Sequence, residues 1–172
     1  MTTAGGASTQ RGIKTFDSAK AVRVDDTPMQ RPPELDQAAR DALPEFRQAG
    51  GSITSLLYGN PESEDGGGMS LVRVRFGANY PLPRHSHSVD CLYYILSGDI
   101  HLGSRVLTAG QGFFVAAGAP YGYTAGPGGV EILEFRPTSS YDSQVRESPI
   151  GWARILGGVR ANRDAWAEEL GS

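Results

Sequence analysis

The sequence has a single cysteine among its 172 residues, only three histidines, and no long apolar run. One cysteine excludes an intramolecular disulfide. No segment approaches the roughly 20 consecutive apolar residues that a membrane-spanning helix needs, and the N-terminal residues lack the apolar stretch of a secretory signal. These absences predict a cytoplasmic protein that does not bind a membrane.

An excess of charge of one sign is also missing. The chain has 16 lysines and arginines against 19 aspartates and glutamates, which gives a net charge of −3. Proteins that bind nucleic acids usually carry a strongly basic surface, so this balance gives no indication of a nucleic-acid partner. A small molecule is therefore the expected ligand.

Glycine and proline are abundant, with 23 and 11 residues, and this favours short strands with tight turns over a helical bundle. The stretch 69–77 alternates cleanly, because Val72, Val74 and Phe76 share one face while Arg73 lies on the other. Further strands are expected at 52–59, at 91–98, at 99–107 (a hairpin that turns at Gly103 and Ser104), at 112–118 and at 130–137. At least seven short strands predict an all-β sandwich or barrel.

The pattern indicates one domain with a separate tail. Residues 1–12 are small and polar, so we expect them to be a disordered tail. Residues 13–172 are expected to form a single domain, with its core strands at about 52–137. A short edge strand is expected near Val22.

Two helices are expected outside the strands. The first should begin at Pro33, which suits the first helical position, and should be interrupted or kinked at Pro44. The second should be short, with Asn162 as its N-cap, and should dock Trp166 and Leu170 on the strands.

The stretch 77–98 contains His85 and His87, and two prolines just before them favour an extended backbone. In a strand, residues two apart point to the same side, so both imidazoles converge on one point. One interpretation is a pair of ordinary polar strand residues. The other, which we favour, is that both bind one divalent transition metal, namely Fe, Zn, Cu or Ni.

This stretch resembles the first motif of the cupin family, which has a glycine, a His-x-His pair, a glutamate and a second glycine. Gly77 leads the motif, the two histidines follow, and Gly98 ends it. Cys91, seven residues before Gly98, stands where the family has its glutamate. The departure puts the usual set of metal ligands in doubt.

The stretch 110–126 is similar to the second cupin motif, a strand, a turn glycine and a histidine. Gly118 matches the turn glycine, and Tyr121 stands where the histidine ligand belongs. The resemblance covers about residues 70–136 and implies a double-stranded β-helix of the jelly-roll type with short N- and C-terminal helical segments. It also implies a homodimer.

The family hosts many activities, so the resemblance leaves several functions open. The first is a metal-dependent enzyme that acts on a small organic molecule, with an oxygenase as first choice and a lyase or isomerase next. The second is a cupin with little or no metal that serves as a small-molecule binding or sensor module. The third is a structural dimer with no ligand.

Cys91 is either a thiolate ligand or a small buried hydrophobic residue. Tyr121 is a hydroxyl in the pocket that acts as general acid or base, or else a phenolate ligand. Tyr93 is either a packed core residue or a catalytic base, since cupin lyases that act on dimethylsulfoniopropionate resemble this sequence in having a tyrosine near that position.

Five more residues are candidates for the wall of the pocket. Arg73 would bind a carboxylate if it faced inward, although a solvent-exposed arginine is the more ordinary interpretation. His101 is the third imidazole of the chain, and the ordinary interpretation is a surface residue. The aromatic residues expected to shape an apolar cavity are Phe76, Phe114 and Tyr123.

Overall fold

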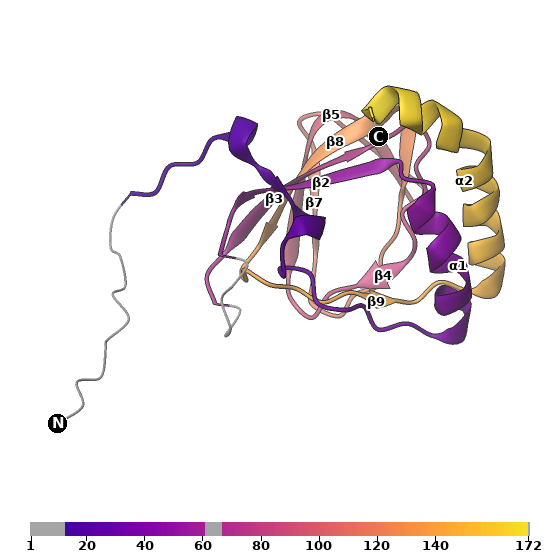
Figure 1. Ribbon diagram of the computed structural model, residues 1–172, viewed down its shortest axis with the longest axis horizontal. Coiled ribbons are helices and arrows are strands. Elements are labelled where there is room, and N and C mark those ends of the chain that lie inside the picture. Colours follow the sequence, from indigo (N-terminus) through magenta and orange to yellow (C-terminus); the bar gives the residue numbers. More distant parts are fainter. Residues whose placement is uncertain (1–12, 61–66, 172) are drawn as a thin grey trace.

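The computed structural model describes residues 13–60 and 67–171, so the expected tail at 1–12 lies outside the described residues. Most of the chain forms an antiparallel sheet, with two helices packed together beside it (Figure 1). The strands of the main sheet are β1 (Val22–Arg23), β2 (Ser52–Tyr58), β3 (Ser70–Phe76), β5 (Cys91–Leu102), β6 (Arg105–Thr108), β7 (Gly112–Val115) and β8 (Thr124–Arg136). A small second sheet consists of β4 (His85–Ser86) and β9 (Gln144–Val145).

The strands of the main sheet follow the order β1, β2, β3, β8, β5 and β6, and β7 also pairs with β5. Every one of these pairings is antiparallel. The strands predicted from the alternating pattern are therefore confirmed, including the edge strand near Val22. Two short 3-10 helices, η1 (Ser18–Lys20) and η2 (Val24–Asp26), flank β1.

Alternation along the strands sorts side chains into a buried and an exposed set. In β3 the side chains of Val72, Val74 and Phe76 are buried, as predicted. In β5 the side chain of Tyr93 is buried, while its neighbour Leu92 is 51% exposed. The buried face of the sheet is the one that faces the helices and the small sheet.

The predicted hairpin between β5 and β6 is confirmed. Leu102 and Arg105 are paired across it, so Gly103 and Ser104 form a two-residue loop. Gly103 has a φ of 61°, the left-handed backbone that such a tight turn needs and that glycine adopts without a steric cost.

Helix α1 (Gln37–Gln48) begins later than predicted. Its N-cap is Asp36, whose carboxylate accepts a hydrogen bond from the Ala39 N–H at 2.8 Å. The prediction that the helix begins at Pro33 is wrong, and so is an interruption at Pro44, which lies inside the helix. Burial of Phe46, two residues further on, helps to offset the loss of the hydrogen bond that proline removes.

Helix α2 (Pro149–Leu170) is far longer than the predicted segment. Its N-cap is Ser148, and Asn162 lies inside the helix, where its side-chain amide donates to the Gly158 carbonyl at 2.8 Å. The prediction that Asn162 caps the helix is therefore wrong. Docking of Trp166 is confirmed, because its side chain is fully buried and its indole N–H donates to the Ala78 carbonyl at 2.8 Å.

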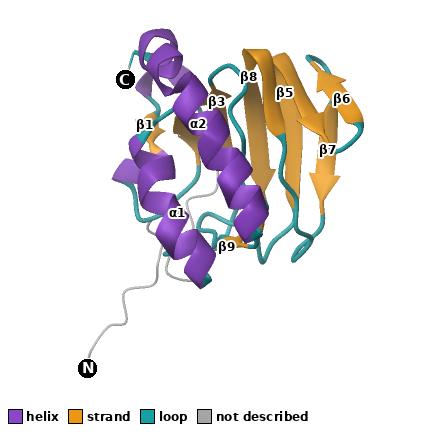
Figure 2. Cartoon of the chain, turned by 90° about the vertical axis from the view of Figure 1, so that its right-hand side faces the viewer, coloured by secondary structure: helices purple, strands orange, loops and turns teal. Residues whose placement is uncertain are grey.

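The two helices lie side by side (Figure 2). Arg160 of α2 donates two hydrogen bonds to the carboxylate of Glu45 of α1, at 2.6 and 2.8 Å, and the rings of Phe46 and Trp152 are 6.0 Å apart. Neither helix of the described chain has the length and apolar character of a membrane span.

Candidate functional site

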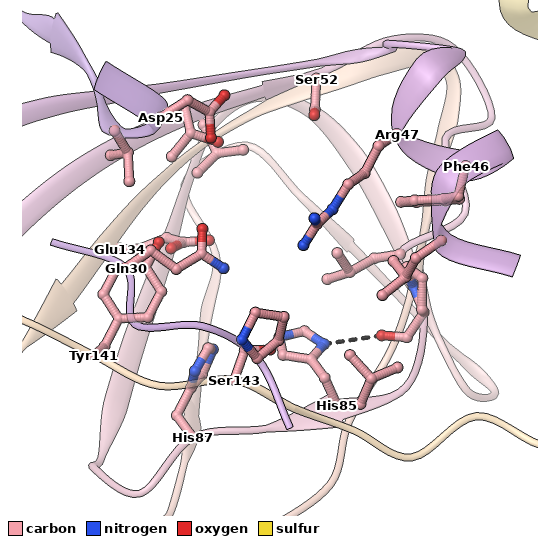
Figure 3. Close-up of a pocket in the computed structure, with 18 of the residues that line it drawn as sticks. Asp25, Gln30, Phe46, Arg47, Ser52, His85, His87, Glu134, Tyr141 and Ser143 are labelled. Carbon is pink, nitrogen blue, oxygen red and sulfur yellow. Dashed lines mark hydrogen bonds between the residues drawn. The ribbon is translucent and has the colours of Figure 1, made fainter. Parts of the chain in front are cut away.

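A cavity of about 670 Å³ lies between the buried face of the sheet, helix α1 and the small sheet of β4 and β9 (Figure 3). His85 and His87 form part of its wall, together with Tyr121. Apolar side chains, among them Phe46 and Phe76, cover much of the rest. The structure therefore brings the predicted histidine pair, Tyr121 and Phe76 to one cavity.

Backbone hydrogen bonds hold His85 opposite Tyr121. The His85 N–H donates to the Tyr121 carbonyl at 2.9 Å, and the Tyr121 N–H donates to the His85 carbonyl at 2.9 Å. On its other side His85 is paired with Val145 of β9. Because the backbone is held from both sides, the direction of the His85 side chain is fixed.

Each imidazole is oriented by a main-chain carbonyl. Nδ1 of His85 lies 2.8 Å from the Pro83 oxygen (Figure 3), and Nδ1 of His87 lies 2.5 Å from the Asp142 oxygen. A carbonyl oxygen only accepts, so Nδ1 carries the proton in both rings and Nε2 is left as an acceptor. The ring centroids are 4.9 Å apart.

Both histidines are neutral at neutral pH. Burial lowers the pKa of His85 to about 4, and the neighbouring His87 lowers it further. Burial, followed by the charge of Arg136, also lowers the pKa of His87 to about 4. A neutral imidazole with a free Nε2 is the form that binds a metal ion, and the carbonyl on Nδ1 is the support that such ligands usually have.

Two phenols lie next to the histidines. The Tyr121 hydroxyl is 3.4 Å from Nε2 of His87, and it is hydrogen-bonded to the Tyr93 hydroxyl. Burial raises the pKa of both phenols well above its usual value, and the charge of Glu134 raises it further. Both therefore keep their protons at neutral pH, and Tyr121, which lines the cavity, is able to donate a hydrogen bond to a ligand.

A buried ion pair that sequence reasoning missed forms another part of the wall. An Nη2 hydrogen of Arg136 bonds to the Glu134 carboxylate, and the guanidinium carbon lies 4.1 Å from the centroid of the Tyr141 ring. Both charged residues belong to β8, and Glu134 is paired with Tyr93 of β5. Within the described residues, Nε and Nη1 of Arg136 have no hydrogen-bond partner. A glutamate and an arginine two apart in an otherwise apolar strand were the available signal.

The donor atoms at the cavity fit a metal that the protein holds by two nitrogens. The two Nε2 atoms are oriented and neutral, and the Tyr121 hydroxyl is the neighbouring oxygen donor. Among residues 13–60 and 67–171, no cluster of three or more His, Cys, Asp or Glu side chains is placed to bind a metal. Such a metal would have most of its coordination positions open to substrate.

Cys91 is fully buried behind the cavity wall and does not line the cavity. Its Sγ lies 3.7 Å from the Val89 carbonyl oxygen, and burial raises the pKa of its thiol. The ordinary interpretation as a buried hydrophobic residue agrees with this position, while its role as a ligand stays a prediction.

Four of the five predicted wall residues do not line the cavity. Phe114 is 61% exposed, because it is paired with the outward-facing Leu92. Its neighbour Phe113 faces inward instead and stacks on Tyr93, with ring centroids 4.5 Å apart. The prediction for Phe114 is therefore wrong by one residue.

Arg73 also points away from the cavity. It forms an ion pair with Glu131 at 3.5 Å on the outer face of the sheet, so the ordinary interpretation holds. His101 is half exposed and lies 3.3 Å from Asp99, so it contributes nothing to the cavity. Tyr123 is buried beside Tyr121, with ring centroids 6.4 Å apart, but it packs behind the wall.

No protein-family model matches the sequence, and no curated protein matches it either. Among solved structures, the polyketide cyclase RemF from Streptomyces resistomycificus is 16% identical, with a TM-score of 0.56 over 86% of this chain and 99% of that chain. A protein of unknown function with a cupin-like fold from Ralstonia eutropha is 14% identical, with a TM-score of 0.52 over 93% of this chain and 89% of that chain. An RmlC-like cupin from Shewanella frigidimarina is 27% identical, with a TM-score of 0.44 over 52% of this chain and 78% of that chain. The chain therefore has a cupin-like fold.

Proposed function

We propose that this protein is an enzyme that transforms a small organic molecule in the cavity, with His85 and His87 holding one divalent transition metal. The observation that carries the proposal is the pair of imidazoles whose Nδ1 atoms are each bonded to a carbonyl. This arrangement leaves both Nε2 atoms unprotonated, and the Tyr121 hydroxyl lies 3.4 Å from that of His87. A pair of ordinary polar strand residues would not need both rings buried, neutral and fixed at the wall of one cavity.

The metals that suit two imidazoles are Fe, Zn, Cu and Ni. The chemistry that such a metal supplies when bound is Lewis-acid polarisation of a substrate oxygen. Tyr121 and its partner Tyr93 supply the proton chemistry. Tyr121 keeps its proton at neutral pH because it is buried, so it is able to donate that proton to a negative charge that develops on the substrate.

The hydroxyl pair favours a proton-transfer reaction of the lyase or isomerase type. Tyr93 is hydrogen-bonded to Tyr121 and is able to donate to the phenolate that Tyr121 becomes once its proton is on the substrate, and the proton that the substrate later loses returns to Tyr121. Glu134 raises the pKa of both phenols, and this keeps the pair protonated between turnovers. Oxygenase chemistry, the first choice from the sequence, stays a prediction, as does the closure of the sheet into a double-stranded β-helix.

Metal content tests the proposal. Wild type, His85→Ala and His101→Ala proteins, all untagged, are dialysed against a mixture of the four metals and analysed by mass spectrometry. We expect about one metal ion per chain in the wild type and in His101→Ala, and its loss in His85→Ala. His101 is the matched control, because it is half exposed and outside the cavity. Equal metal content in His85→Ala and wild type would contradict the proposal.

A binding or sensor module without metal is the second candidate. It is favoured by the lack, in the described part of the chain, of a third His, Cys, Asp or Glu side chain beside the pair. A wild-type protein that carries no metal after the dialysis, yet binds small molecules in the cavity, would establish this alternative.

A further inference from the structure

The cavity wall is basic, although the chain as a whole is acidic. The net charge of the chain is −3. The charged residues that line the cavity are four arginines and two acids, namely Arg23, Arg31, Arg47, Arg136, Asp25 and Glu134. A concave site of one sign within a molecule of the opposite sign concentrates ligands of complementary charge. The charge of this cavity therefore favours an anion.

Three of these six charged residues are tied to neighbours. Arg136 is paired with Glu134, and Arg31 donates a hydrogen bond to the Ser140 hydroxyl at 3.1 Å. No ion pair or hydrogen bond joins the guanidinium of Arg47 to another described residue, and the same holds for the side chains of Arg23 and Asp25. Arg47 is therefore distinguished by its direction and not by its lack of a partner.

Arg47 belongs to the last turn of α1, where a positive side chain often stabilises the exposed carbonyls of the helix end. Here the side chain extends away from the helix instead. Figure 3 shows its guanidinium reaching into the cavity, with His85 and His87 on the far side. An interaction with the helix end therefore does not explain its direction, which places the exposed guanidinium where a ligand in the cavity would contact it.

Apolar side chains also line the cavity. Phe46 and Leu43 come from α1, and Phe76 comes from β3. A molecule in the cavity can contact the guanidinium at one end and the imidazoles at the other, with these apolar side chains among those that surround it. The planar guanidinium forms two parallel hydrogen bonds with a carboxylate, a geometry that a neutral amide does not reproduce.

We propose that the substrates of this cavity are small organic carboxylates, with the carboxylate bound by Arg47 and the reacting group placed at His85, His87 and Tyr121. The assignment of the reacting end rests on the proposed function. The assignment of the carboxylate end to Arg47 rests on the charge and direction of that side chain.

Calorimetric titration with matched acids and amides tests the proposal. The probes are salicylate against salicylamide and succinate against succinamide, each measured in the presence of a chelator so that metal plays no part. We expect the wild type to bind at least one acid about tenfold more tightly than its amide, because charge-assisted hydrogen bonds contribute more than neutral ones. Equal affinity for acid and amide, or no binding of either acid, would overturn the proposal.

Three variants locate the effect. Arg47→Gln should abolish the preference for the acid, and Arg47→Lys, which keeps the charge but loses the planar fork, should retain part of it. Arg154→Gln removes the same charge from an exposed position on α2 outside the cavity, so it should behave as wild type. A preference that survives Arg47→Gln would also overturn the proposal.

Metal content separates this inference from the proposed function. Arg47→Gln should keep the metal of the wild type, and His85→Ala should keep the preference for the acid. A wild type that binds no metal but prefers the acid would refute the proposed function and retain the carboxylate site. A wild type that binds metal but shows no preference for the acid would refute the carboxylate site and retain the proposed function.

Discussion

The hydroxyls of Tyr93 and Tyr121 are hydrogen-bonded to each other, although the two residues lie 28 positions apart in the chain. Tyr93 reaches this point from β5, and Tyr121 from the segment that is bonded to the backbone of His85. One hydroxyl of the pair donates to the other, and the remaining proton is available to His87 or to a ligand. The pair thus connects the strand core with the cavity wall.

The state of these phenols is open to a direct test by alkaline titration. Burial raises the pKa of Tyr80 and Tyr141 to about 12, and raises the pKa of Tyr93, Tyr121 and Tyr123 well above the usual value. The folded state therefore keeps protons that the unfolded state releases near pH 10, so stability is complete below about pH 10 and falls as the pH rises. We expect most tyrosinate absorbance to appear together with the loss of tryptophan fluorescence. Ionisation of all seven tyrosines in a protein that stays folded would contradict this.

The pair of Glu134 and Arg136 leads to a prediction on stability. Both side chains are buried, so Arg136→Met leaves a carboxylate without its partner inside the protein. We expect a loss of about 3–5 kcal/mol in the free energy of unfolding, measured with urea. The double variant Glu134→Gln/Arg136→Met should lose less, because no unpaired charge remains.

A second arginine–glutamate pair in the same sheet is the control for this prediction. Arg73 and Glu131 are 3.5 Å apart, with side chains 31% and 28% exposed. Because water screens them, Arg73→Met should cost less than about 1 kcal/mol. If Arg136→Met and Arg73→Met lowered the free energy of unfolding by the same amount, burial of the pair would not determine the size of the loss.

The strands were predictable because their signal is local. In β3 the alternation of Val72, Val74 and Phe76 is visible within seven residues, and the structure buries that set. The hairpin at Gly103 is local for the same reason. Phe113 and Phe114 show the limit of this reasoning. One of two adjacent phenylalanines must face outward, and pairing with β5 decides which.

The buried ion pair of β8 and the full length of helix α2 were not predicted, because both depend on contacts with residues far away in the sequence. Charged residues in a strand usually face water, so Glu134 and Arg136 are recognised as buried only once β8 is placed between β3 and β5. Helix α2 was predicted to begin only at Asn162, because asparagine is a typical N-cap, and Gly157 and Gly158 before it have low helix propensity. Burial of Trp152 and Val159 on either side of these glycines offsets their low helix propensity.

The histidine pair gives the protein without metal an acid-sensitive stability. The pKa of both His85 and His87 is lowered to about 4, mainly by burial. The unfolded chain takes up protons at these positions near pH 6.5, well before the folded state does, so stability is complete above that pH and falls as the pH decreases toward about 4. The loss should be on the order of 3 kcal/mol per histidine, since each pKa unit corresponds to about 1.4 kcal/mol. Urea unfolding of chelator-treated protein should show that the free energy of unfolding falls between about pH 6.5 and about pH 4 in wild type and in His101→Gln. In His87→Gln the decrease should be about half as large. A wild type that is equally stable at both ends of the range would mean that these imidazoles are protonated in the fold, and neither would then present a free Nε2 to a metal.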